Sequence, residues 1–95
     1  MEQKWITAFV KAREEAGTLG VRMRTIPPVE ALSAAHRLLS GQRLSDGFTQ
    51  LAQLERLDLS LEALTVDRRF TALFTDEEAN EALTRLLEAG YRFGK

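Results

Sequence analysis

The residues best suited to chemistry in this chain are one histidine and a group of carboxylates. His36 is the only imidazole and cysteine is absent, so thiolate and multi-histidine metal sites are excluded. Acidic residues gather from Asp76 to Glu81, and carboxylates spaced four apart could bind a hard cation. The same acids lie where the first turn of a helix favours negative charge, so the helix dipole alone explains them. We therefore expect no bound metal.

Nucleophilic and nucleotide-binding signatures are also missing. The stretch 17–20 contains two glycines but lacks the lysine and the serine or threonine of a phosphate-binding loop, and no strand precedes it. His36 is near the expected end of a helix, a position that favours a capping or half-buried structural role. We expect that the protein is not an enzyme and that it takes no cofactor.

The strongest functional motif is a possible helix-turn-helix over Leu54–Arg69. Two apolar segments meet at Asp58, and Ser60 can cap the second of them. The residues expected to contact DNA in this reading are Thr65, Arg68 and Arg69. Leu54 is large for a close crossing of two helices, and the local charge is negative, which disfavours phosphate contact. DNA binding is therefore the alternative hypothesis, and a helical hairpin inside the core would explain the same residues.

Charge is nearly balanced overall but uneven along the chain. The sequence has 13 Lys and Arg against 14 Asp and Glu, whereas nucleic-acid-binding domains are usually far more basic. Residues 1–50 carry seven basic and five acidic groups (net +2), and residues 51–95 carry six and nine (net −3). The basic window 18–45 and the acidic window 76–88 could complement each other in two copies, although solvated helix faces would explain both.

Apolar spacing predicts an all-α protein, a compact bundle of about five short helices in a single domain of residues 1–95. The expected helices cover residues 4–16, 28–41, 45–57, 60–74 and 75–90. Sparse β-branched residues argue against a sheet, although Val21–Thr25 alternates like a short extended segment. Ser60 and Thr75 are the expected N-caps, and Thr75 with Glu78 matches a capping box. The expected core residues include Phe48, Leu51, Leu64, Phe70, Leu83 and Leu86.

Aromatic and basic residues suggest a surface for protein partners. The interface candidates are Trp5, Phe9, Arg22, Arg24, Tyr91 and Phe93. Tryptophan and tyrosine dominate interface hot spots, but the same rings could instead pack the two ends of the bundle together. A helix over residues 4–16 could dock separately from a core over 28–90 and offer its apolar stripe to a second chain. We expect a small interaction or regulatory protein that forms a homodimer or binds a protein partner.

No apolar run is long enough for a membrane span or a signal peptide, so we expect a cytoplasmic protein without membrane contact. The stretch from Arg43 to Leu73 resembles small bacterial or mobile-element proteins in general character. No motif in it names a family, and the resemblance assigns no role to any residue.

Overall fold

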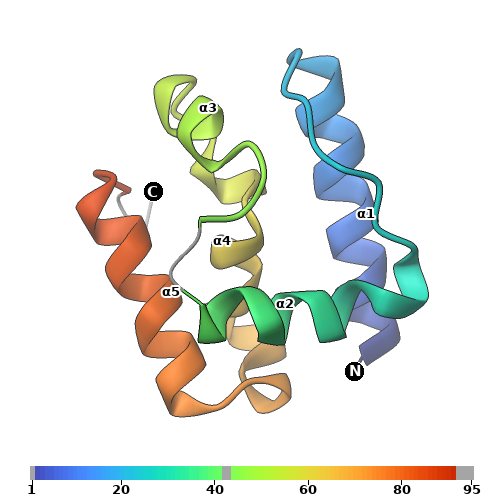
Figure 1. The fold of residues 1–95 in the computed structure, drawn as a ribbon, viewed down its shortest axis with the longest axis vertical. Coiled ribbons are helices and arrows are strands. Elements are labelled where there is room, and N and C mark those ends of the chain that lie inside the picture. The colour runs from blue at the N-terminus through green and yellow to red at the C-terminus, as the bar shows by residue number, and fades with distance from the viewer. Residues whose placement is uncertain (1, 42–43, 92–95) are drawn as a thin grey trace.

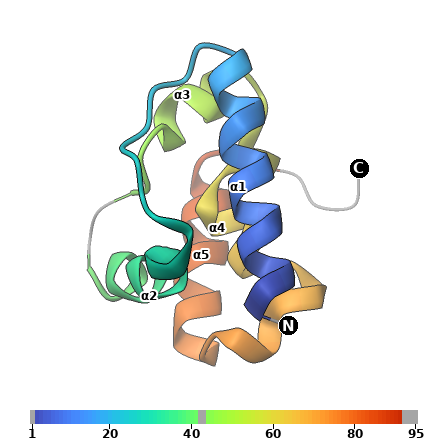
Figure 2. The ribbon, with the colours of Figure 1, turned by 90° about the vertical axis from the view of Figure 1, so that its right-hand side faces the viewer.

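Helix α1 is the longest element of the computed structural model, which describes residues 2–41 and 44–91. It spans Glu2–Thr18, and its buried residues are spaced by three or four, so they form one helical face. At Gly20 the backbone takes a φ of +86°, and the chain reverses. Residues 21–27 then run back as an extended segment beside α1 (Figure 2). This segment pairs with no strand among the described residues.

Helix α2 (Ala31–Ser40) follows a 3-10 turn at Pro28–Glu30, where proline suits the first turn. The later elements are α3 (Phe48–Gln53), a 3-10 turn (Leu57–Leu59), α4 (Leu61–Thr65), a 3-10 turn (Arg68–Leu73) and α5 (Asp76–Glu88). Helices α1 and α5 lie on opposite sides with α4 between them, and α2 runs across their lower ends (Figure 1). The predicted all-α bundle is confirmed.

The segment 60–74 is not one continuous helix. Ser60 caps α4 by accepting a hydrogen bond from the backbone N–H of Ala63 at 3.1 Å, as predicted. The helix ends at Thr65, and Asp67 adopts an extended conformation and caps a new 3-10 turn through the N–H of Arg69. A short aspartate side chain competes in this way with helix continuation, so the chain bends between the two elements.

Helix α5 has the ends that its sequence predicts. Thr75 Oγ1 accepts from the N–H of Glu78 at 3.1 Å, and Glu78 Oε1 accepts from the N–H of Thr75 at 2.8 Å, which completes the capping box. At the other end, Gly90 has a φ of +87° and the N–H of Tyr91 donates to the carbonyl of Leu86 at 2.9 Å. This closure satisfies carbonyls that the last turn leaves free.

One hydrophobic core joins all the helices, and residues 4–16 belong to it through α1. Trp5 stacks on Phe9 with ring centroids 5.3 Å apart and meets the edge of Phe74 at 5.9 Å. The expected core residues that are buried are Phe48, Leu51, Leu64, Phe70 and Leu86. Leu83 was the wrong choice, because the inward positions of α5 belong to Ala82, Arg85 and Leu86. No helix in the described part of the chain is long and apolar enough to cross a membrane.

Candidate functional site: an arginine-lined cleft

A cleft of about 330 Å³ lies between α1, the extended segment, α2 and the loop that precedes α3. Its polar lining comprises Arg13, Arg24, Thr25, Glu30, Arg37, Ser45 and Asp46. Its apolar lining comprises Ile26, Pro27, Ala34, Leu38 and Leu61. The cleft therefore combines three guanidinium groups with these five apolar residues, which we call its apolar floor. This composition suits a ligand with both negative charge and hydrocarbon.

Arg13 anchors the α1 side of the cleft. Its guanidinium lies 5.0 Å from the centre of the Phe9 ring and donates a hydrogen bond to the backbone carbonyl of Arg24. Partial burial lowers the pKa of Arg13, and the nearby Asp46 carboxylate opposes this shift. No carboxylate of residues 2–41 or 44–91 lies within ion-pair distance of this guanidinium, so its charge is only partly compensated.

Arg24 and Arg37 line the cleft with solvent-exposed side chains. The N–H of Arg24 donates to Asp46 Oδ2 at 3.1 Å, while the Arg24 side chain is exposed and its Nε is 3.9 Å from the same oxygen. Arg37 is exposed on α2 and forms no ion pair with a described residue. The lining of the cleft holds two carboxylates, Asp46, which pairs with Arg24, and Glu30. Its three arginines outnumber these two carboxylates, so the lining carries a net positive charge.

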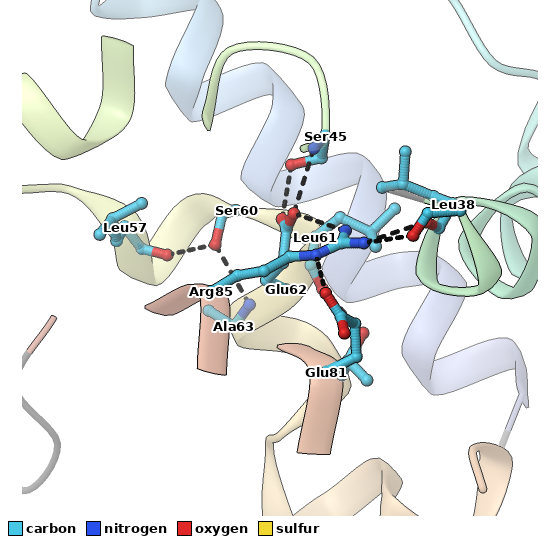
Figure 3. Close-up of polar contacts among 11 residues, drawn as sticks. Leu38, Ser45, Leu57, Ser60, Leu61, Glu62, Ala63, Glu81 and Arg85 are labelled. Carbon is cyan, nitrogen blue, oxygen red and sulfur yellow. Dashed lines mark hydrogen bonds and ion pairs between the residues drawn. The ribbon is translucent and has the colours of Figure 1, made fainter. Parts of the chain in front are cut away.

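A buried carboxylate fixes the loop wall of the cleft (Figure 3). Glu62 on α4 is completely buried, and its Oε1 accepts from the hydroxyl of Ser45 at 2.5 Å. The backbone N–H of Ser45 donates to Glu62 Oε2 at 3.1 Å. Ser45 is therefore held by two hydrogen bonds at the position where it lines the cleft.

Arg85 on α5 neutralises Glu62 from the other side. Only 5% of its surface is exposed, and its Nη1 lies 3.6 Å from Glu62 Oε2. Its Nε donates to Glu81 at 2.7 Å (Figure 3). Its Nη2 donates to the carbonyl of Gly41 at 2.9 Å. The sequence reading missed this pair. The spacing of Arg85 from Ala82 and Leu86 was the one signal that it shares the inward face of α5.

Two of the expected interface rings, those of Trp5 and Phe9, are not on the surface. Trp5 and Phe9 are almost fully buried against their own chain, so they offer a partner no contact area; intramolecular packing explains their aromatic size. Arg22 and Arg24 are exposed, and Tyr91 is partly buried beside the core. The remaining candidate, Phe93, lies outside the described residues.

The residues expected to contact DNA do not form one exposed surface. Thr65 was placed wrongly: it is completely buried, and its hydroxyl donates to the carbonyl of Leu61 at 3.0 Å. Helix α4 has five residues, of which four are buried, whereas a recognition helix must expose one face to the major groove. Arg68 is exposed, and Arg69 pairs with Asp67 at 2.8 Å.

His36 and the acidic segment have structural partners. His36 Nδ1 lies 2.5 Å from Glu78 Oε2, and this contact joins α2 to α5. The His36 ring also packs against the Phe74 ring, with centroids 5.2 Å apart. Glu78 also completes the capping box, and Glu81 pairs with Arg85. Within the described ranges, no three His, Asp or Glu side chains gather in a way that could hold a metal ion.

Comparison of this chain with protein-family models, curated proteins and solved structures finds no match.

Proposed function

We propose that this chain is a small, non-enzymatic interaction or regulatory protein of the cytoplasm whose arginine-lined cleft binds an acidic segment of a protein. The observation that carries the proposal is that guanidinium groups outnumber carboxylates in a cleft that also has an apolar floor. Guanidinium groups bind carboxylates through paired hydrogen bonds, and arginine is enriched at the centres of protein interfaces. An acidic side chain with an apolar neighbour would satisfy both parts of the cleft.

Exposed apolar residues next to the lining favour a protein ligand over a small anion. Val29, between Pro27 and Glu30 of the lining in sequence, is 80% exposed. Leu44, which precedes Ser45, is 46% exposed. A free carboxylate or phosphate would leave both side chains in water, whereas a polypeptide can cover them while its acids meet the arginines. The surface around the cleft thus supports a partner larger than an ion.

The proposal is tested with a fluorescent, helix-forming peptide of about 14 residues, long enough for a marginal helix, that carries glutamates and one leucine pair. A matched peptide has glutamine in place of every glutamate. We expect anisotropy to report binding of the acidic peptide only, and the affinity to fall as salt is raised. Equal binding of the two peptides would contradict an electrostatic cleft.

Charge reversal locates the binding surface. Arg24→Glu combined with Arg37→Glu should weaken binding of the acidic peptide at least about tenfold, because attraction becomes repulsion at two sites. Both side chains are exposed, so the fold should tolerate the change. The control is Arg68→Glu, an exposed reversal outside the cleft lining. If the control weakens binding as much as the double variant, the cleft is not the site.

A further inference from the structure

We propose that the acidic segment is helix α5 of a second copy of this chain, which docks Leu83 and Leu87 against the apolar floor of the cleft. This inference rests on the proposed function and names its partner.

Helix α5 exposes apolar side chains on its outer surface. Leu83 and Leu87 are 36% and 56% exposed, while Ala82 and Leu86 face the core. The two leucines are four residues apart and therefore neighbours on the helix. Asp76 lies seven residues before Leu83, so it continues the same stripe toward the start of the helix. This stripe, formed by Asp76, Leu83 and Leu87, has the mixture of charge and hydrocarbon that the cleft requires.

The charges of the helix and the cleft are complementary. Glu78 and Glu81 are occupied by His36 and Arg85 within the chain. The acids of α5 that are exposed and form no ion pair with a described residue are Asp76, Glu77 and Glu88. Of these acids, Asp76 belongs to the stripe, whereas Glu77 and Glu88 flank it on the outer surface of the helix. In the cleft, Arg13 and Arg37 form no ion pair with a described residue, while Arg24 pairs with Asp46. Complementary potentials of this kind select partner and orientation.

One copy of the chain cannot make this contact with itself. Helix α5 packs on α2 and α4 through its opposite face, and none of its residues lines the cleft. It lies on the far side of the molecule from α1, which forms one wall of the cleft (Figure 1). The stripe and the cleft can therefore meet only between two molecules.

Two complementary variants test the contact. The cleft variant carries Arg24→Glu and Arg37→Glu and keeps α5 intact. The stripe variant carries Leu83→Gln and Leu87→Gln and keeps the cleft intact. All four positions are exposed, and circular dichroism checks that each variant is folded. Leu54→Gln is the matched control, because Leu54 is an exposed leucine outside both surfaces.

We expect wild type and the control to sediment above the 10.7 kDa monomer mass as concentration approaches about 1 mM, the upper range of weak dissociation constants. Each variant alone should stay monomeric. Their equimolar mixture should regain a complex of one copy of each, because the cleft of one can bind the stripe of the other.

Two results would overturn the inference. Wild type that stays monomeric throughout this range excludes the second copy; if the acidic probe peptide still binds, the proposed function stands with another protein as partner. Wild type that associates while the mixture stays monomeric means that copies meet through another surface. Wild type that neither self-associates nor binds the acidic probe peptide would reject the proposed function itself.

Discussion

Arg85 on α5 and Glu62 on α4 form an ion pair inside the protein, with Nη1 3.6 Å from Oε2. Glu62 also holds Ser45, which lines the arginine-rich cleft, so a single carboxylate ties the cleft wall to α5 (Figure 3). The surface that we propose as a receptor and the helix that we propose as its ligand are therefore braced by the same buried contact. A change to this ion pair should therefore affect both the cleft and helix α5.

Removing one member of the pair should be costly. Arg85→Met leaves Glu62 buried without a countercharge, and we expect a loss of about 3–5 kcal/mol in the free energy of unfolding. Adding Glu62→Leu should recover much of that loss, because no uncompensated charge remains inside. Urea unfolding of wild type and the two variants measures this; a double variant no more stable than Arg85→Met would contradict it.

The two leucine positions 64 and 83 should respond very differently to truncation. Leu64 is buried, so Leu64→Ala should lower the free energy of unfolding by about 2–5 kcal/mol. Leu83 is exposed at the surface of α5, so Leu83→Ala should change the free energy of unfolding by less than about 0.5 kcal/mol. Thermal and urea unfolding at a concentration where the protein is monomeric make the comparison. Equal losses would mean that α5 is rotated from its position here.

The N-cap of α5 depends on a hydroxyl group. Thr75→Ala removes the acceptor for the N–H of Glu78 and should cost about 0.5–2 kcal/mol of stability. Thr75→Ser keeps that acceptor and should cost little. Equal losses from both substitutions in urea unfolding would show that the methyl group matters rather than the cap.

Glu78 should make stability fall in acid. Burial alone would raise the pKa of Glu78, but hydrogen bonds from the Thr75 backbone and from His36 outweigh it and hold the pKa below its usual value. The folded state therefore favours the ionised form. This contribution is present above the unfolded pKa, about 4.3, and is lost as pH falls through the lower folded pKa.

The check is urea unfolding of wild type and Glu78→Gln from about pH 6 down to about pH 3, across this titration. The stability advantage of wild type should shrink as the solution becomes more acidic. A constant difference over the whole range would mean that ionisation of Glu78 contributes nothing.

Gly47 should not tolerate a side chain. Its φ is +77°, and an added Cβ would lie 2.6 Å from Val21 Cγ1 and 2.9 Å from Met23 Cε. Gly47→Ala should therefore destabilise the protein by more than about 1 kcal/mol, because strain and overlap add. The control is Gly17→Ala inside α1, where a Cβ meets nothing within 4 Å and should stabilise by up to about 1 kcal/mol. Thermal unfolding midpoints that move in the same direction would contradict this prediction.

The local features of the fold follow from short stretches of sequence. The capping box at Thr75, the cap at Ser60, the helix-ending Gly90 and the helical period of apolar residues are all present as predicted. Each depends on residues within about four positions of one another, because helix hydrogen bonds and caps join neighbours along the chain. Short-range chemistry therefore established an all-α chain.

Which helix faces are covered depends on how the helices pack against one another. Charged residues such as Glu62 and Arg85 usually face solvent, and Leu83 is spaced like a core residue. Packing of α5 on α2 and α4 instead buries the charged pair and leaves Leu83 exposed. Trp5 is buried because Phe9 and Phe74 meet it there. The cleft likewise gathers arginines from positions 13, 24 and 37. Such proximity arises from long-range packing of helix faces, which no local pattern of residues encodes.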